Sequence, residues 1–254
     1  LQALLPGLQA IAAIAAPARD ALTLAATETL TGIDLAITGA SPTLSADRRA
    51  AIIQAADKLS LARLSINGEV AMERTPPILR MGGVDVVPPP GGFLQATQES
   101  ETAMVGLVCE ALEGAARVVD LFSGAGTFTL PLAANASVHA VEGEVAGLQA
   151  LGRAIRKVQG IKPITTEKRY LFRQPLNQID LSRFDGAVID PPRAGAEVQT
   201  RELALSGIRK VAMVSCNAQT FVRDLKIMLE AGFRLKQLTP IDQFLWSPHV
   251  EIVA

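Results

Sequence analysis

Three residues in the second half of the chain carry side chains that can do covalent and acid–base chemistry: Cys216, Asp190 and Glu251. Cys216 follows the apolar run Val211–Val214 and precedes a helical segment, so we place it in the loop after a strand. A cysteine is more often a small core residue than a nucleophile. Cys216, however, lies at a strand's carboxyl end, on the edge that also carries Asp190, and this place favours a role as nucleophile over a role in the core. The sequence shows no partner that would lower the pKa of this thiol.

The two acids differ in their setting. Asp190 ends the apolar run Gly186–Ile189 and precedes Pro191-Pro192-Arg193, in which two prolines restrict the backbone. It could be a helix N-cap, but Asp-Pro-Pro-Arg at this place favours an acid held beside a transferred group. Glu251 lies in the closing run Pro248–Ala254. An acid there is usually an exposed strand residue, yet its apolar neighbours favour burial, which would raise its pKa toward that of a general base.

A glycine loop, Phe122–Phe128, follows another apolar run. Gly124 and Gly126 let the backbone turn sharply and approach a ligand, and a larger residue replaces the third glycine of a dinucleotide fingerprint. Asp120, just before the loop, would repel phosphate. Glu142, 22 residues later, ends the next expected strand and could accept hydrogen bonds from ribose hydroxyls. These charges favour S-adenosylmethionine, a cation, over NAD.

Alternating strands and helices must position these residues. After residue 90 we predict strands at 117–121, 138–141, 163–167, 186–189 and 211–214, helices at 95–113, 127–134, 145–158 and 218–231, and a closing β region at 233–254. Such alternation predicts right-handed crossovers, a mainly parallel sheet, and ligands at the carboxyl ends of its strands. Cys109 falls inside a predicted helix and is interpreted as a core residue.

The first ninety residues indicate a smaller α+β unit. Ser45 is the expected N-cap of a helix that ends near Leu59, and Asn67-Gly68 is a hairpin turn signal. Further β-type runs cover 22–27, 33–38, 61–66 and 69–72, with a second hairpin around Gly82-Gly83. Because Pro88–Gly92 interrupts regular structure, we predict two domains, 1–90 and 91–254.

Composition sets limits on function. The 254 residues are 49% apolar and carry a formal net charge of −1, which is mild evidence against an extensive RNA-binding surface. The apolar start Leu8–Ala16 is too short to span a membrane. The two cysteines provide neither a disulfide framework nor a metal site, so we expect a cytoplasmic protein without a metal on this chain. Leu1 in place of methionine suggests a fragment that lacks an N-terminal module.

Five segments together resemble the bacterial RNA 5-methyluridine methyltransferase family. They are 93–97 (FLQAT), 119–128 (VDLFSGAGTF), 190–195 (DPPRAG), 215–220 (SCNAQT) with Arg223-Asp224, and 249–251 (HVE), and their order matches from about residue 90 to the end. The resemblance implies a Rossmann-like class I methyltransferase sheet, S-adenosylmethionine as cofactor, and RNA, ribosomal or transfer, as substrate.

The resemblance also implies roles for individual residues. A thiolate, here Cys216, adds to carbon 6 of uracil, and a base, here Glu251, later removes the proton on carbon 5. Phe93 would stack on the uracil, which must leave its base stack, and Gln95 and Asp190 would bind the uracil edge. The resemblance assigns cofactor binding to Gln95, Phe122, Gly124, Gly126, Thr127, Glu142 and Asp190.

The chain departs from the family pattern in several places. Thr97 stands where the family has an amide, and Tyr170 stands where members usually have an acid that contacts adenine. The iron–sulfur cysteines of many members and their small β-barrel RNA-binding module are also absent, and we expect both in a missing N-terminal part.

A basic stretch runs from residue 153 to 173. It holds seven basic residues against a single acid, Glu167; they are Arg153, Arg156, Lys157, Lys162, Lys168, Arg169 and Arg173. A solvated helix face and a phosphate-contacting patch explain it equally well.

Two other functions stay open. A methyltransferase acting on an amino group would use an acid or amide, two prolines and an aromatic residue; Arg193 occupies the aromatic position, and Cys216 would have no role. A catalytically silent RNA-binding module fits the departures at Thr97 and Tyr170, but an intact Cys216 and Glu251 argue against it. The sequence does not indicate an oligomeric state.

Overall fold

The computed structural model describes residues 4–16, 21–244, 246–247 and 249–254. Two compact units make up the chain: Leu1–Arg80 with Asp85–Gly92, and Met81–Val84 with Phe93–Ala254. The segment Pro88–Gly92, at which we predicted the domain boundary, closes the smaller unit. A two-stranded sheet of β5 (Leu79–Met81) and β6 (Val84–Val86) turns at Gly82-Gly83, as predicted.

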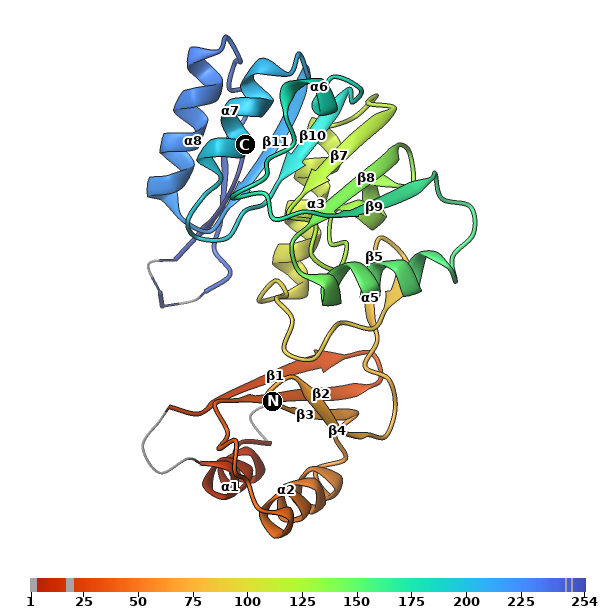
Figure 1. Ribbon diagram of the computed structural model, residues 1–254, viewed down its shortest axis with the longest axis vertical. Coiled ribbons are helices and arrows are strands. Elements are labelled where there is room, and N and C mark those ends of the chain that lie inside the picture. Colours follow the sequence, from red (N-terminus) through yellow and green to blue (C-terminus); the bar gives the residue numbers. More distant parts are fainter. Residues whose placement is uncertain (1–3, 17–20, 245, 248) are drawn as a thin grey trace. The chain divides into compact units, whose positions relative to one another are not determined.

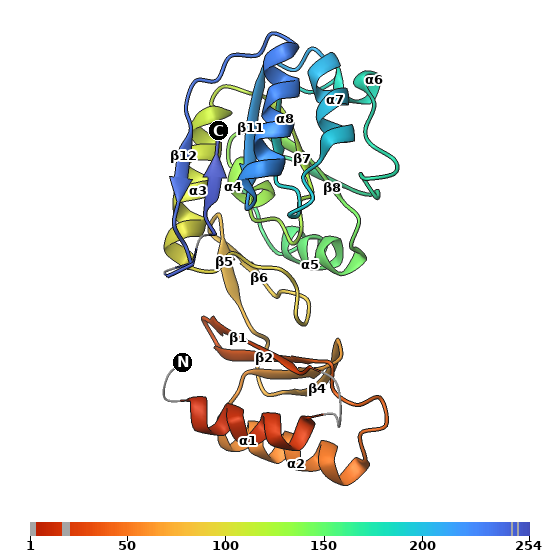
Figure 2. The same ribbon diagram turned by 90° about the vertical axis from the view of Figure 1, so that its left-hand side faces the viewer.

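The smaller unit is a four-stranded sheet covered by two helices. Its strands are β1 (Thr23–Thr29), β2 (Gly32–Thr38), β3 (Arg63–Ile66) and β4 (Glu69–Glu73), in that order, and its helices are α1 (Leu5–Ala15) and α2 (Ala46–Lys58). Figure 2 shows α1 and α2 side by side on one face of the sheet. Ser45 caps α2 by accepting a hydrogen bond from the Arg48 N–H, which confirms that prediction. Helix α1 was not expected from the sequence; Pro6 is tolerated there because it lies in the first turn.

A buried ion pair lies within this sheet. Asp34 and Arg63 are direct neighbours on β2 and β3, and the Arg63 guanidinium donates to both carboxylate oxygens at 2.9 and 2.6 Å. Arg63 also donates to the carbonyl oxygen of Pro88 at 2.9 Å. The pair therefore fixes the proline segment to the sheet with charge-assisted hydrogen bonds.

The larger unit is built on a seven-stranded sheet (Figure 1). The strand order is β12-β13-β11-β10-β7-β8-β9, in which β9, β8, β7, β10 and β11 are parallel and β13 is antiparallel to both neighbours. The strands are β7 (Arg117–Leu121), β8 (Ser137–Glu142), β9 (Ile164–Lys168), β10 (Gly186–Ile189), β11 (Lys210–Ser215), β12 (Thr239–Ile241) and β13 (Glu251–Val253). This architecture confirms the predicted α/β, Rossmann-like fold class with a smaller α+β part.

Helices cover both faces of this sheet. Val118 packs toward α3 (Gln98–Ala111) and α4 (Thr129–Leu132), whereas its neighbour Val119 belongs to the opposite cluster, under α6 (Gln178–Leu181), α7 (Glu197–Leu205) and α8 (Ala218–Glu230). The remaining helix, α5 (Val145–Ile155), packs against β8 and β9. Burial on both faces explains the mostly apolar character of the central strands β7, β10 and β11, whereas the edge strand β9 is largely exposed.

Three sequence expectations need correction. The helices α6 and α7 were not predicted, and the predicted closing β region 233–254 is reduced to β12 and β13. The predicted helix 127–134 shortens to α4, a single turn. Among the described residues, no helix has the length and apolar character needed to cross a membrane.

Candidate active site

The predicted chemical residues meet at one edge of the larger sheet. Ile189 pairs with Leu121, so Asp190 and Phe122 follow neighbouring strand ends, and the Asp190 N–H donates to the Leu121 carbonyl at 3.2 Å. On the other side, Ser215 of β11 pairs with Ile252 of the antiparallel β13. Cys216 and Glu251 are the next residues beyond this pair, and the charge of Glu251 acts on the Cys216 thiol.

The loop after Asp190 is held by the start of α8. The carbonyl oxygen of Arg193 accepts hydrogen bonds from the Asn217 amide at 3.0 Å and from the Thr220 hydroxyl at 3.2 Å. The carboxylate of Asp224 accepts from the Ala196 N–H at 2.7 Å. The polar residues around Cys216 therefore support the loop that carries Asp190, a role that the motif alone did not reveal.

Gly195 allows the loop after Asp190 to lie close against the start of α8. Its φ of +72° lies in the left-handed region, and a Cβ at this position would meet the side chains of Arg223, Asp224 and Thr220. Only glycine satisfies both the conformation and the close approach.

The two acids at this edge are hard to ionise. Burial, and then the charges of Glu251 and Asp120, raise the pKa of Asp190 to about 8. Glu251 is 3% exposed, and burial raises its pKa, opposed by a hydrogen bond from Gln243 and the charge of Arg193. At neutral pH Asp190 is therefore mostly protonated and can donate a hydrogen bond.

The structure also bears on the activation of Cys216. Burial, followed by the charges of Glu251 and Asp190, raises the pKa of this thiol, while Arg193 acts in the opposite direction. The thiol is therefore protonated in the resting site and must lose its proton as it reacts. Cys109 is half-buried and packs against the core beneath α3, as predicted.

Gln243 is a site residue that the sequence reasoning missed. It is 7% exposed, and its amide group donates to the Glu251 carboxylate at 2.9 Å and to the Gln95 side-chain oxygen at 3.3 Å. It lies eight residues before Glu251 in sequence, but 148 residues from Gln95. No spacing pattern marks such a long-range contact.

The remaining substrate candidates precede α3. Phe93 is 80% exposed, which leaves its ring available for stacking. Gln95 is half-buried. Thr97, the departure from the family pattern, is the N-cap of α3 and accepts a hydrogen bond from the Ser100 N–H at 3.1 Å. A threonine therefore suffices at this position because its hydroxyl caps the helix.

The glycine loop and its neighbours offer carboxylate acceptors that suit a nucleoside bearing a cationic group. Glu142 accepts hydrogen bonds from the N–H groups of Gly124 at 2.9 Å and Glu144 at 2.8 Å. A Cβ on Gly124 would meet nothing within 4 Å, so a ligand can approach this backbone. Asp120 is fully buried, and within the described part of the chain its Oδ1 has no hydrogen-bond partner, nor does the hydroxyl of Ser123. Unpaired buried polar atoms of this kind point to a polar ligand.

Aromatic side chains line the other side of the loop. The Phe122 ring lies 5.3 Å from that of Phe172, which lies 5.6 Å from the ring of Tyr170. Phe122 has a φ of +66°, a strained conformation that the loop imposes on a non-glycine residue. A small cavity of about 140 Å³ lies beside Phe122 and Phe172 and reaches Gly195. Tyr170 thus contributes apolar surface where the family pattern has an acid. Thr127 lies half-buried in the same loop.

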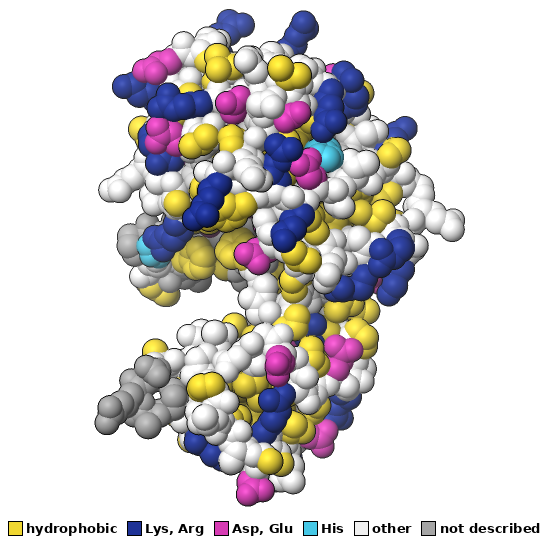
Figure 3. Space-filling view, viewed as in Figure 1, with side chains coloured by type: hydrophobic (Ala, Val, Ile, Leu, Met, Phe, Trp, Pro, Cys, Tyr) yellow, Lys and Arg dark blue, Asp and Glu magenta, His cyan; other side chains and the backbone are white. Residues whose placement is uncertain are grey.

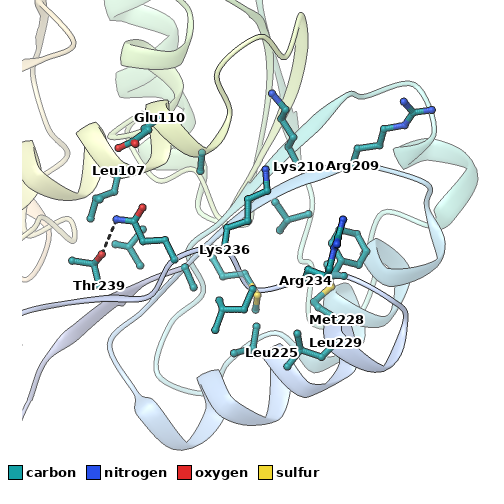
Figure 4. A pocket seen from close by; sticks show the side chains of 18 of the residues that line it. Leu107, Glu110, Arg209, Lys210, Leu225, Met228, Leu229, Arg234, Lys236 and Thr239 are labelled. Atoms are coloured by element: carbon teal, nitrogen blue, oxygen red, sulfur yellow. Dashed lines mark hydrogen bonds between the residues drawn. The ribbon is translucent and has the colours of Figure 1, made fainter.

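A larger cavity lies elsewhere in this unit. About 460 Å³ in volume, it is bounded by α3, β11, α8 and the segment 233–239, as Figure 4 shows. Lys210 in its wall begins β11, whereas Cys216 follows the end of that strand. The cavity is therefore separate from the candidate site. In the described ranges, no cluster of three or more His, Cys, Asp or Glu side chains could hold a metal ion.

The basic stretch is largely exposed. Six of its seven basic side chains are exposed, and Figure 3 shows Lys and Arg gathered near α5. Arg169 differs, because it pairs with Glu167 at 2.5 Å and lies 3.6 Å from Asp180. The six exposed cations remain candidates for phosphate contacts.

The chain is similar in sequence to known RNA methyltransferases. Residues 88–253 match the family model described as tRNA (uracil-5-)-methyltransferase. An uncharacterized RNA methyltransferase of Rhizobium meliloti (strain 1021) is 49% identical over 96% of this chain and 59% of its own length. A 23S rRNA (uracil(1939)-C(5))-methyltransferase of Pseudomonas savastanoi pv. phaseolicola is 36% identical over 65% of this chain and 37% of its own.

A solved structure shares the fold. The Pyrococcus abyssi tRNA (uracil-54, C5)-methyltransferase is 22% identical, with a TM-score of 0.71 over 91% of this chain and 58% of that one. The chain thus spans about three-fifths of the length of several curated relatives that it matches. On the family match over residues 88–253, this chain belongs to the tRNA (uracil-5-)-methyltransferase family.

Proposed function

We propose that this chain transfers a methyl group from S-adenosylmethionine to carbon 5 of a uridine in RNA, through a covalent bond to Cys216. The observation that best supports the proposal is the pairing of Ser215 on β11 with Ile252 on β13, because Cys216 and Glu251 adjoin this pair and Asp190 follows the neighbouring strand β10. A nucleophile, a buried base and a protonated acid are the groups that this chemistry needs.

Carbon 5 of uracil is too weak a nucleophile to take a methyl group unaided. The partly exposed Cys216 thiol gives its proton to solvent water, and its sulfur adds to carbon 6. The displaced π electrons make carbon 5 and the adjacent carbonyl oxygen electron-rich. Asp190, protonated at neutral pH, can donate a hydrogen bond to that oxygen. Bound S-adenosylmethionine would supply an electrophilic methyl group: carbon 5 takes the methyl group as the sulfonium–methyl bond breaks, and the pair of that bond stays on the departing thioether sulfur.

The second half of the reaction belongs to Glu251. Its carboxylate accepts the proton from carbon 5, and the electron pair of that C–H bond forms the new double bond between carbons 5 and 6. The bond from carbon 6 to sulfur breaks, and its pair returns to Cys216. The burial of Glu251 strengthens it as a base.

The glycine loop and its neighbours would hold the cofactor. Glu142 suits the ribose hydroxyls, while Asp120 and the Ser123 hydroxyl provide polar atoms for the cationic methionine part. The rings of Phe122 and Tyr170 offer a surface for the adenine. Gly126, Thr127, Gln95 and Asp190 complete the proposed cofactor contacts.

RNA is the proposed partner. The relative from Pseudomonas is named for ribosomal RNA and the Pyrococcus neighbour for transfer RNA, so both classes are candidates. Phe93 and Gln95 would bind a uracil that has left its stack, and the basic stretch would contact phosphates. A role in RNA modification agrees with the cytoplasmic location expected from the sequence.

The covalent step is directly testable. We would incubate the chain with S-adenosylmethionine and 5-fluorouridine-containing transcripts of 23S rRNA and tRNA, then measure the protein's mass. Fluorine at carbon 5 cannot leave as a cation, so the adduct should persist with the wild type. It should vanish with Cys216→Ala and survive in the matched control Cys109→Ala. An adduct that persists in Cys216→Ala would contradict the proposal.

A further inference from the structure

Gln243 is an unusually well-satisfied polar residue in the loop between β12 and β13. It is 7% exposed, and both ends of its amide are used: Oε1 accepts from the Ala96 N–H at 3.2 Å, and Nε2 donates to Glu251 at 2.9 Å and Gln95 at 3.3 Å. The nearby carboxylate and the Gln95 amide come from segments far apart in the chain. One side chain thus joins the proposed base to a proposed substrate-binding residue.

The orientation of this amide follows from its surroundings. A backbone N–H such as that of Ala96 can only donate, so it requires the amide oxygen of Gln243 on its side. The NH₂ group must then face Glu251 and the side-chain oxygen of Gln95. Because the oxygen of Gln95 is used in this contact, the NH₂ group of Gln95 is directed toward other acceptors, such as a uracil carbonyl.

We infer that Gln243 is a positioning residue, which holds the Glu251 carboxylate ionised and aimed at carbon 5 and fixes the donor end of Gln95. The inference rests on the proposed function, because it assigns Gln243 a task only if Glu251 is the base. Gln243 touches neither reacting atom, and its effect passes through its two partners.

The electrostatics around Glu251 indicate what Gln243 contributes. Glu251 is faced by Asp190 and Cys216 from the ends of β10 and β11, and by Arg193, whose guanidinium also contacts His249 at 3.1 Å. Burial raises the pKa of Glu251, and the hydrogen bond from Gln243 lowers it. A hydrogen bond to the charged form favours that form, so its removal would raise the pKa further. Proton transfer from carbon 5 to Glu251 would then fail at a pH where the wild type still works.

The test compares Gln243→Met with Gln237→Met as matched control. Gln243→Met keeps the volume but removes the NH₂ group that donates to Glu251 and Gln95 and the oxygen that accepts from the Ala96 N–H. Gln237 is exposed and bonds only to the nearby Thr239 hydroxyl among the described residues. Product release would be followed in single turnovers on uridine-containing transcripts, as a function of pH. In the plot of release rate against pH, we expect the acid limb of Gln243→Met to lie about one pH unit higher than that of the wild type, with the alkaline plateau unchanged. Below the limb, release should be roughly tenfold slower, and the covalent adduct should accumulate.

A second variant covers the case in which Gln243→Met does not fold. Gln243→Glu keeps an acceptor for the Ala96 N–H but sets a second acid beside Glu251, so the acid limb should move up further. An unmoved limb, or a loss of rate that is equal at every pH, would overturn the inference. The 5-fluorouridine adduct separates the two claims: if the wild type forms it, only the role of Gln243 fails, and if it does not, the proposed function fails.

Discussion

Replacing Gly195 by alanine should damage the loop that carries Asp190. A left-handed residue other than glycine costs about 1–2 kcal/mol. The new Cβ would also displace the side chains of Arg223 and Asp224, and with them the hydrogen bond from the Ala196 N–H to Asp224. A hydrogen bond to a charged group contributes about 1.5–3 kcal/mol. The sum predicts that Gly195→Ala lowers the free energy of unfolding by about 2.5–5 kcal/mol.

The matched control is Gly160→Ala. Gly160 also has a left-handed backbone, with φ of +80°, but a Cβ there would meet nothing within 4 Å. We expect this variant to lose only the backbone cost of about 1–2 kcal/mol. Urea denaturation followed by circular dichroism would measure both. Equal losses for the two variants would refute the reasoning that close packing around Gly195 holds the loop.

Two further predictions concern other parts of the chain. Arg63→Met leaves Asp34 as an unpaired buried charge and should lower the free energy of unfolding of the smaller unit by about 3–5 kcal/mol. The double variant Arg63→Met with Asp34→Leu should lower it by less, because no charge is left unpaired. Urea denaturation measures both variants, and equal losses would argue against the buried pair. Charge reversal at Arg156 and Lys157 should weaken RNA binding and flatten its dependence on salt, measured by fluorescence anisotropy against Lys226→Glu, an exposed control on α8. Unchanged binding would favour a merely solvated helix face.

The strands of the larger unit could be predicted well from sequence. The expected bounds 117–121 and 186–189 coincide with β7 and β10, because strands covered on both faces are built around short apolar runs such as Val118-Val119 and Ala187–Ile189. The helix α7 escaped prediction since its buried face includes Gln199, whose amide bonds to both backbone groups of Leu176. A polar side chain that packs against a distant loop interrupts the apolar periodicity by which a helix is recognised in the sequence.

The candidate site also has a part that the sequence predicts and a part that it does not. Topology alone places Asp190 and Cys216 at one edge, because the carboxyl ends of parallel strands meet there. The contacts of Gln243 depend on a loop that returns beside the segment before α3, and local sequence carries no information on that path. The raised pKa of Cys216 was also beyond sequence reasoning, since it depends on burial and on carboxylates that come from separate strands.

The position of the transferred methyl group tests the central claim most directly. The chain would be supplied with S-adenosylmethionine and unmodified rRNA or tRNA transcripts that carry tritium at carbon 5 of uridine. We predict that 5-methyluridine appears among the nucleosides and that one tritium is released for each methyl group incorporated. Methyl groups on an amino nitrogen, with tritium retained at carbon 5, would contradict the account.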